Sequence, residues 1–341
     1  MKTILVTGGA GYIGSHTVVE LLNAGYKVVV ADNFCTSKHF IINQVEIITS
    51  KKPIVFEGDL CNQTFVQDVF NANKYDAIIH FAAFKAVGES VEQPLKYYKN
   101  NLFSLINLLD ACANNGIKNF VFSSSCTVYG TPEVLPVSEQ TPLQVATSPY
   151  GNTKQISEEI ITDFVKSKEF NAISLRYFNP VGAHKSALIG ELPIGSPNNL
   201  VPFVTQTAIG KRQQLSVFGG DYNTPDGTCI RDYIHVVDLA KAHVKAIERL
   251  FTGISKNRNE FINIGTGKGY SVLEAIKSFE KVSEQKLNYK VVERRAGDVE
   301  RVFADTTLSN KILNWKAELN LDDMMLSAWN WEKYCKTNNI E

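Results

Sequence analysis

The stretch that decides the fold is Ile4-Leu5-Val6-Thr7-Gly8-Gly9-Ala10-Gly11-Tyr12-Ile13-Gly14. Its first residues are apolar and predict a short buried strand, and the glycines after them predict a tight turn that opens a helix. Because Gly8, Gly11 and Gly14 recur at every third position, the backbone of this turn is left largely uncovered by side chains.

This turn has the features of a dinucleotide-binding loop. An uncovered backbone lets N–H groups approach a pyrophosphate, and the N-terminus of the following helix favours negative charge. A second strand over residues 27–31 ends in Asp32, about 20 residues further on, where a carboxylate can bind the adenosine ribose hydroxyls. Asp32 would repel a 2′-phosphate, and no arginine follows it before Lys38, so the sequence favours NAD over NADP. An ordinary glycine turn is the alternative, and the flanking strand and helix argue against it.

Composition narrows the class of protein. The chain has 341 residues, 44% of them hydrophobic, which suits one large domain or two moderate ones. Lys plus Arg equals Asp plus Glu at 35 each, so charge gives no reason to expect nucleic acid or a membrane as a partner. The six cysteines are scattered, and the first strand leaves no room for a signal peptide. We therefore expect a cytoplasmic protein with free thiols.

Strand and helix patterns alternate through the first half of the chain, which predicts an α/β fold with a doubly wound parallel sheet of the Rossmann type. Residues 180–235 are instead rich in Gly, Pro and Asn. We expect residues 1–179 to form the NAD-binding domain and residues 180–341 a smaller mixed α/β substrate domain. Later segments, around 230–240, are allowed to return to the first domain.

Tyr150 and Lys154 are four residues apart on a predicted helix, so both side chains lie on one face within a turn. A free tyrosine has a pKa of about 10, too high for a base at neutral pH. A nearby ammonium and the positive ring of an oxidised nicotinamide would favour the phenolate and make Tyr150 a general base. The pair alone is a weak signal, and it gains weight from the glycine loop and from the serines at 123–125 upstream.

The glycine loop and the set Ser125, Tyr150 and Lys154 resemble the extended short-chain dehydrogenase/reductase family. Within it, the chain is similar almost end to end to the UDP-glucose 4-epimerases. The segments that carry this narrower resemblance are 175–184 (LRYFNPVGAH), 197–200 (PNNL), 226–236 (DGTCIRDYIHV) and 294–298 (RRAGD).

The resemblance implies an NAD-dependent isomerase that interconverts UDP-glucose and UDP-galactose through a bound 4-keto sugar. Tyr150 would exchange the proton of the sugar 4-hydroxyl, Ser125 would bind the 4-oxygen, and Lys154 would hold the nicotinamide ribose and tune Tyr150. Hydride would leave sugar C4 for NAD and return to the opposite face, so NAD is regenerated.

The resemblance also implies two sets of binding residues. The positions that match cofactor contacts are Gly8, Gly11, Tyr12, Ile13, Gly14, Asp32, Asn33, Asp59, Leu60, Phe81, Lys85, Asn100, Tyr150, Lys154 and Phe178. Those that match UDP-sugar contacts are Ser125, Tyr150, Asn179, Asn199, Leu200, Arg231, Arg295, Asp298 and Val302. Arginine suits a diphosphate because its planar fork binds oxygens in pairs. Two alternatives stay open: both arginines as solvated surface charges, and Asp59 as the cap of the next helix instead of an adenine ligand.

Val302 carries a separate hypothesis. In this family a bulky residue at its position is associated with rejecting N-acetylated sugars, and a small one with accepting them. Val302 is of modest size, so acceptance of UDP-N-acetylglucosamine is one interpretation, and exclusion of the acetamide by other pocket residues is the other.

The sequence also bears on two rival functions, on metal binding and on the quaternary state. A sugar-nucleotide 4,6-dehydratase needs an acidic pair beside the serine, where this chain has Cys126 and Thr127. A catalytically silent NAD-binding scaffold would tend to lose the pair Tyr150 and Lys154. The histidines lack metal-ligand spacing, so no metal is expected. The family pairs through two long helices, here near 95–115 and 150–168, which implies a homodimer.

Overall fold

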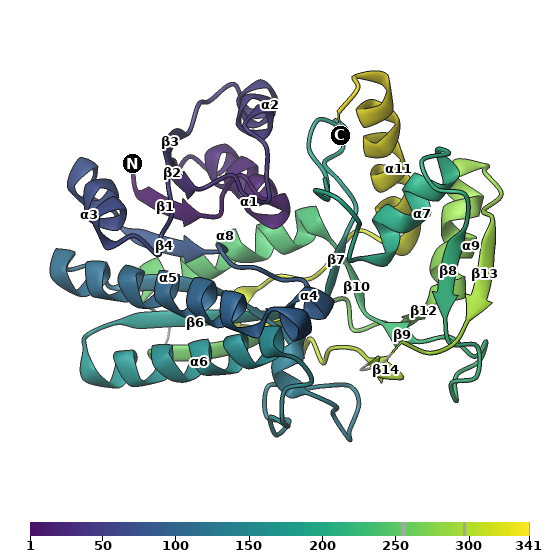
Figure 1. The fold of residues 1–341 in the computed structure, drawn as a ribbon. Coiled ribbons are helices and arrows are strands. Elements are labelled where there is room, and N and C mark those ends of the chain that lie inside the picture. The colour runs from purple at the N-terminus through teal and green to yellow at the C-terminus, as the bar shows by residue number, and fades with distance from the viewer. Residues whose placement is uncertain (254–256, 296–297, 341) are drawn as a thin grey trace.

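In a computed structural model, which describes residues 1–253, 257–295 and 298–340, seven strands of the described chain form one parallel sheet (Figure 1). In spatial order they are β11 (Asn259–Ile264), β6 (Asn171–Tyr177), β5 (Asn119–Ser125), β4 (Ala77–His80), β1 (Thr3–Thr7), β2 (Lys27–Asp32) and β3 (Ile54–Glu57). The doubly wound parallel sheet predicted from the sequence is confirmed.

Helices cover both faces of this sheet. One face packs on α1 (Tyr12–Asn23), α2 (Phe40–Thr49) and α8 (Val236–Thr252), and the other on α3 (Gln63–Ala72), α5 (Pro94–Asn115) and α6 (Pro149–Ser167). Along β1, Ile4 and Val6 contribute to the first core and Leu5 to the second. Burial on both faces explains why the strands read as continuous apolar runs.

Three smaller sheets and their helices lie beyond the carboxyl ends of the main strands, at the right of Figure 1. The strands are β7 (Asn179–Val181), β8 (Leu215–Phe218), β9 (Ile230–Arg231), β10 (Tyr233–His235), β12 (Tyr270–Ser271), β13 (Tyr289–Val292) and β14 (Arg301–Val302). Their helices are α7 (Leu200–Ala208), α9 (Val272–Ser283) and α11 (Leu321–Thr337). Helix α10 (Thr307–Leu313) instead packs against α8 and β11, and α4 (Val87–Glu92) lies beside α5. A third core between α7, α9 and α11 includes Val204, Phe279 and Met325.

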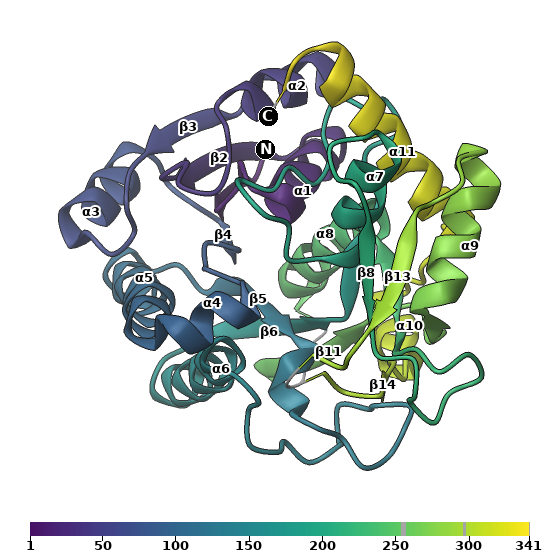
Figure 2. The same ribbon diagram turned by 45° about the vertical axis from the view of Figure 1, so that its right-hand side comes forward.

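Late segments of the chain also belong to the layer of the main sheet. Helix α8 packs against α1, and strand β11 pairs with β6 at the edge of the main sheet. Figure 2 shows α8 and β11 lying with the main sheet, away from α9 and α11. The chain therefore returns to its first layer after residue 235, and the division at residue 179 stays a prediction.

Strand β5 is longer than its apolar residues suggest. The sequence predicts a strand over residues 120–122, whereas β5 continues through Ser125. The reason is pairing, because Ser123, Ser124 and Ser125 are in register with residues 175–177 of β6. Backbone hydrogen bonds between strands do not depend on the polarity of the side chains.

None of the helices in the described part of the chain combines the length and the apolar character that a membrane crossing requires.

Candidate active site

The glycine loop lies where the order of the main sheet reverses, between β1 and β4. Ligands of doubly wound sheets bind in the crevice at such a point. Gly8 has a φ of +69°, and a Cβ there would come within 2.7 Å of the backbone nitrogen of Ala82. A Cβ on Gly14 would collide with the carbonyl oxygen of Gly8. Both positions therefore require glycine, which keeps the backbone open to a ligand.

Helix α1 begins at this loop with its first-turn N–H groups uncapped by a side chain, because its N-cap is Gly11. Such an N-terminus is suited to an anion. Tyr12 donates its hydroxyl to the carbonyl of Gly182 at 2.7 Å, and Ile13 packs against the core. The loop thus fits the pyrophosphate of a dinucleotide and is tied to the segment that follows β7.

Asp32 is the last residue of β2, beside the loop, and Asn33 follows it. Asp32 Oδ2 accepts from the N–H of Ala10 at 2.9 Å, and its Oδ1 accepts from the N–H of Phe34 at 2.9 Å. Asn33 Oδ1 accepts from the N–H of Cys35 at 3.1 Å. The Asp32 carboxylate therefore holds the glycine loop in place at the position where a ribose would bind.

Asp59 does not cap the next helix. The N-cap of α3 is Asn62, whose side chain accepts from the N–H groups of Thr64 and Phe65. Asp59 Oδ1 instead accepts from the N–H of Cys61 at 2.8 Å. The capping alternative is wrong, because the turn places Asn62 and not Asp59 at the start of the helix.

Four other residues predicted to line the cofactor make different contacts in the structure. Leu60 is buried, and Asn100 donates to Asn101 Oδ1 at 2.9 Å. The ring of Phe81 lies 4.7 Å from that of His243 and packs on the core. Phe178 is buried, and it packs in a cluster with Val302. Phe178, which is predicted to line the cofactor, therefore contacts the cluster that contains Val302, which is predicted to contact the sugar.

Tyr150 lies in the first turn of α6. Ser148 caps this helix by accepting from the N–H of Gly151 at 3.1 Å, and Pro149 opens it. Ser125 is the last residue of β5, and its Oγ accepts from the N–H of Thr127 at 3.2 Å. Burial raises the pKa of Tyr150 to about 12, and the nearby Ser125 hydroxyl acts against that rise. The sequence-predicted pair of serine and tyrosine is therefore brought together.

Lys154 lies one turn after Tyr150 and is only 4% exposed. Its Nζ donates to the carbonyl of Ser123 at 2.6 Å and lies 5.9 Å from the centre of the Tyr150 ring. Burial lowers the pKa of Lys154 to about 7, and the charge of Glu158 opposes that shift. A positive ring bound near Tyr150 would lower the pKa of the phenol, because it favours the phenolate.

Three of the predicted UDP-sugar residues form one ionic group. Arg295 Nη2 donates to Asp298 Oδ1 at 2.7 Å, and Arg231 Nη2 lies 3.7 Å from the same oxygen. Arg231 is mostly buried, whereas the side chain of Arg295 is 59% exposed. Asn179 begins β7, which pairs with β10, and its N–H donates to the carbonyl of Asp232 at 2.9 Å.

A second group joins residues of both halves of the chain through Glu191. Asn199 precedes Leu200 at the start of α7, and its Nδ2 donates to Glu191 Oε1 at 2.6 Å. Lys85 Nζ lies 3.3 Å from the same oxygen. The sequence analysis missed Glu191, because a single glutamate in a loop rich in Gly and Pro carries no signal of its own.

Val302 lies in β14 and is in register with Arg231 of β9. Its side chain is buried against Phe178, Val128 and Ala304. The residue predicted to control sugar size is therefore one strand away from the residue predicted to hold the diphosphate.

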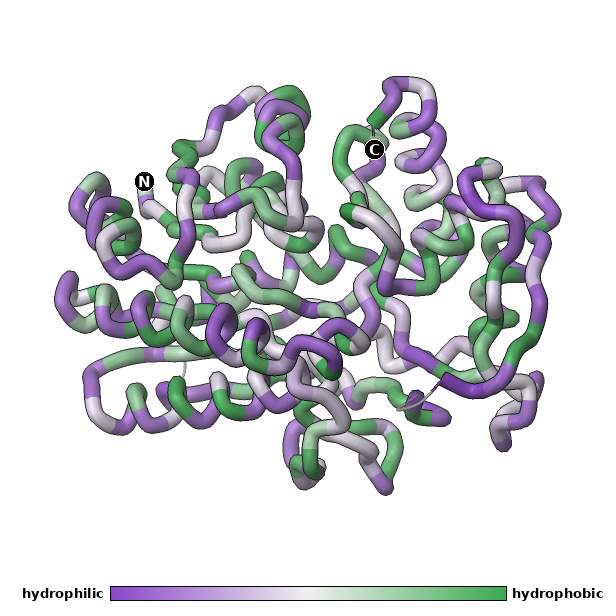
Figure 3. Tube along the Cα trace, viewed as in Figure 1, coloured by the Kyte–Doolittle hydropathy of each residue, from purple (hydrophilic) through white to green (hydrophobic). Residues whose placement is uncertain are grey.

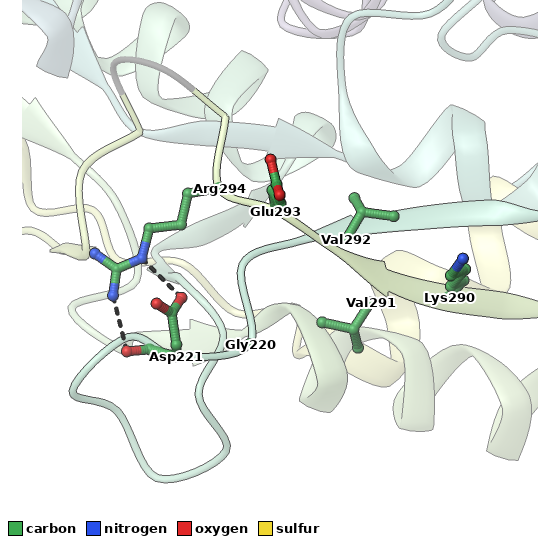
Figure 4. Close-up of a pocket in the computed structure, with 7 residues that line it drawn as sticks. All are labelled: Gly220, Asp221, Lys290, Val291, Val292, Glu293 and Arg294. Atoms are coloured by element: carbon green, nitrogen blue, oxygen red, sulfur yellow. Dashed lines mark hydrogen bonds and ion pairs between the residues drawn. The ribbon is translucent and has the colours of Figure 1, made fainter.

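Among the described residues, no group of His, Cys, Asp and Glu could hold a metal ion. His235 instead caps α8 by accepting from the N–H of Val237 at 3.1 Å. An open groove of about 720 Å³ lies beside the ionic group, lined by Gly220, Asp221 and residues 290–294. Figure 4 shows Arg294 turned toward Asp221 in this groove. The groove contains none of the predicted site residues, although Arg294 adjoins Arg295.

Comparisons with known proteins agree with this geometry. The family model described as GDP-mannose 4,6 dehydratase matches residues 5–327. The UDP-glucose 4-epimerase of Drosophila melanogaster is 51% identical over 337 residues, which cover 97% of this chain and 96% of the relative.

Solved structures of UDP-glucose 4-epimerases are also similar to this chain. The UDP-glucose 4-epimerase of Bifidobacterium longum in complex with NAD+ and UDP has a TM-score of 0.94 and 47% identity, with 100% of both chains covered. The UDP-Glc/GlcNAc 4-epimerase of Campylobacter jejuni has a TM-score of 0.84 and 38% identity, and it covers 98% of this chain and 100% of that chain. On this sequence and fold, the chain belongs to the UDP-glucose 4-epimerase family.

Proposed function

We propose that this protein interconverts UDP-glucose and UDP-galactose by reversible epimerisation at C4, with NAD as its cofactor. One observation carries the proposal: Ser125, Tyr150 and Lys154 meet where the carboxyl end of β5 faces the first turns of α6, beside an open glycine loop. A close relative in sequence and the NAD+ and UDP complex from Bifidobacterium longum support it.

The dinucleotide fits the loop at Gly8 and Gly14, the N-terminus of α1 and the carboxylate of Asp32. Bound there, NAD would supply the hydride acceptor and donor for sugar C4. Residues 1–179, together with α8 and β11, would form the part of the molecule that holds it, and the remainder would hold the UDP-sugar.

The chain's own residues then move the proton. Tyr150 takes it from the sugar 4-hydroxyl and returns it, which a buried phenol with a pKa of about 12 does only when positive charge nearby favours the phenolate. Lys154 supplies such charge from 5.9 Å away. Ser125 would hold the 4-oxygen, because its hydroxyl lies near enough to Tyr150 to affect the pKa of the phenol.

The nucleotide must stay anchored while the sugar turns between the two hydride transfers. Arg231 and Arg295 can bind the diphosphate with their planar forks, and both already meet at the Asp298 carboxylate. Asn179 and Asn199 with Leu200 would hold the rest of the UDP group. A firm grip on UDP and a loose one on the hexose lets both sugar faces reach the same reactive centre.

Dehydration is the less favoured reaction, although the matching family model carries the name of a 4,6-dehydratase. Cys126 and Thr127 follow Ser125 where that reaction needs carboxyl groups. Burial raises the pKa of Cys126 to about 12, so its thiol is a poor proton donor or base at neutral pH. A silent scaffold is disfavoured because the three reacting residues are assembled.

We also propose that a second copy of the chain covers the outer face of α5. Apolar residues recur along α5 and α6 (Figure 3), and Leu95, Phe103 and Ile106 of α5 are 69%, 53% and 40% exposed. Exposed apolar faces of this kind mark protein interfaces. A cytoplasmic location is proposed as well, which fits six cysteines that are all unpaired in the described chain.

The test is direct. Purified protein is mixed with UDP-galactose without added cofactor, and the sugar anomeric signals are followed by NMR. Appearance of UDP-glucose supports C4 epimerisation and retention of NAD through purification. If the signals stay unchanged, NAD is added, and continued absence of product would refute the proposed activity.

A further inference from the structure

A buried carboxylate lies directly behind the proposed catalytic residues. Glu158 stands one helical turn after Lys154 on α6, and its side chain is 4% exposed. Arg176 of β6 binds it through two hydrogen bonds, from Nε to Oε1 at 2.9 Å and from Nη2 to Oε2 at 2.6 Å. Such a fork fixes the orientation of both groups as well as their distance.

Glu158 also holds the strand that ends in the proposed catalytic serine. Ser124 Oγ donates to Glu158 Oε1 at 2.6 Å, and Ser124 is in register with Arg176. Successive residues of a strand point to opposite faces, so a bond that fixes Ser124 also fixes the direction in which Ser125 points. The carboxylate thus acts on Ser125 without touching it.

The network continues into the core. Arg176 Nη1 donates to the hydroxyl of Tyr129 at 3.0 Å, and Tyr129 donates to Asn263 Oδ1 at 2.7 Å. Tyr129 and Asn263 are fully buried. These bonds join α6, β6, the turn after Ser125 and β11, and a satisfied buried network of this kind is rigid.

The charge of Glu158 has a second effect, on Lys154. The groups around the Lys154 ammonium are Tyr150 and Glu158 on its own helix, His80 of β4 and the carbonyl of Ser123 on β5. His80 is neutral at physiological pH, because burial lowers its pKa to about 3. Among these groups, Glu158 is the one whose negative charge favours the protonated amine.

We propose that Glu158 is a positioning residue: through Ser124 it directs Ser125 at Tyr150, and its charge keeps Lys154 protonated during turnover. This inference rests on the catalytic roles assigned under the proposed function. A merely structural ion pair would stabilise the fold without setting the pH range of catalysis.

Glu158→Gln tests the charge, because glutamine keeps the shape and loses the negative charge. We expect kcat at pH 8 to fall about tenfold and the basic limb of its pH profile to move down by about one pH unit, since Lys154 then loses its proton more readily. The KM for UDP-galactose should stay within about twofold, because Glu158 reaches the reaction only through other residues.

Glu332→Gln is the matched control. Glu332 is also a buried carboxylate, it lies 3.0 Å from Lys211 Nζ, and it accepts from Thr205 Oγ1 at 3.0 Å, but it belongs to α11. Its pH profile should match that of the native protein. Should Glu158→Gln not fold, the double variant Glu158→Gln/Arg176→Gln replaces it in the same measurement, since it leaves no unpaired buried charge.

Ser124→Ala tests the second link, because it leaves the ion pair intact. We expect a kcat several-fold lower with an unshifted pH profile. Ser174→Ala is its control, since Ser174 is a buried serine of β6 whose hydroxyl has no hydrogen-bond partner within the described chain.

The outcomes distinguish the effect of the Glu158 charge on Lys154 from its positioning of Ser125. A Glu158→Gln profile that superimposes on the native one overturns the charge role, and equal kcat for Ser124→Ala and Ser174→Ala overturns the positioning role. A native protein that does not epimerise UDP-galactose contradicts the proposed function itself.

Discussion

Burial raises the pKa of the Tyr150 phenol and the nearby Ser125 hydroxyl lowers it, so the reactivity of Tyr150 depends on the balance of the two effects. Tyr150→Phe keeps the ring and removes the proton carrier. We expect kcat to fall by about 10²- to 10⁴-fold, the usual contribution of a positioned acid or base. The dissociation constant of UDP, measured by calorimetry, should hardly change. Tyr289→Phe, a change in the exposed strand β13, serves as control, and an active Tyr150→Phe enzyme would exclude this role.

The size of the side chain at Val302 is expected to decide whether N-acetylated UDP-sugars are accepted. Its side chain fills the space beside Phe178, so a larger residue there would intrude on the sugar end of the site. We expect the native protein to turn over UDP-N-acetylglucosamine and Val302→Tyr to lose this activity at least tenfold more than that on UDP-glucose. NMR of both substrate pairs measures it. Equal rejection of the N-acetylated pair by native protein and variant would rule out the hypothesis.

Glu191 joins Lys85 and Asn199 across the site. Glu191→Ala should raise the KM for UDP-galactose about 3- to 10-fold with a smaller change in kcat, because it removes an anchor of binding groups and no reacting group. Steady-state kinetics separates the two constants. Glu169→Gln removes a similar ion pair, with Lys118, on the exposed surface and should leave both unchanged. A loss confined to kcat would contradict the assignment.

At this scale the sequence predicts residues that share a short motif. The interval between Tyr150 and Lys154 is enough by itself to place both on one helical face, and Asp32 follows from its position at a strand end. Glu191 and Glu158 escape such reasoning, because their partners lie far along the chain or on another element. For Asp59, only the observed turn shows that Asn62 makes the cap.

At the scale of elements, α5 carries the test of self-association. Phe103→Glu places a charge in the apolar stripe with Leu95 and Ile106, and we expect it to convert a dimer into a monomer. Light scattering coupled to gel filtration measures the mass. Ile47→Glu, an equally apolar exposed site on α2, should leave the mass unchanged. A native protein of monomer mass would contradict the proposed pairing.

The lengths of the helices and strands show which features a local sequence pattern can predict and which it cannot. Helices α5 and α6 are predicted to within a few residues because their apolar spacing and caps are local signals. Strand β5 is predicted too short, since Ser123 to Ser125 are polar and their pairing with β6 depends on residues far along the chain, at 175–177. The part of β5 that the pattern omits is the part that presents Ser125.

At the scale of the whole molecule, buried histidines set a pH dependence of stability. Burial lowers the pKa of His16 and His80 to about 3 and of His235 and His243 to about 4. The folded state therefore keeps them neutral while the unfolded chain binds protons below pH 6.5. Stability is full above that pH and is lost as pH falls, by on the order of 1 kcal/mol per histidine per pH unit. Asp232, whose pKa burial raises, opposes part of the loss.

Urea unfolding at pH 7.5, 6.5 and 5.5 measures this. The midpoint should fall slightly over the first step and several-fold more over the second, because an unfolded histidine is half protonated at about pH 6.5. His16→Gln should make the fall shallower, whereas His39→Gln, at an exposed position, should not. A midpoint that does not change down to pH 5.5 would contradict the assignment of neutral buried histidines.

The overall fold is the part that the sequence predicts best, because alternation of strands and helices repeats many times. The placement of β11 is the exception. Nothing in residues 259–264 states that they pair with β6, which lies more than 80 positions earlier, so only the assembled molecule reveals the seventh strand.

The return of α8 and β11 to the first layer has a consequence for biosynthesis. A ribosome that has released residues 1–179 has supplied six of the seven strands, but β6 still exposes its free edge and α1 the face that α8 will cover. An exposed strand edge is a template for pairing with other chains. The nascent polypeptide therefore stays open to aggregation until residue 264 has emerged, and premature termination anywhere before it should yield insoluble fragments.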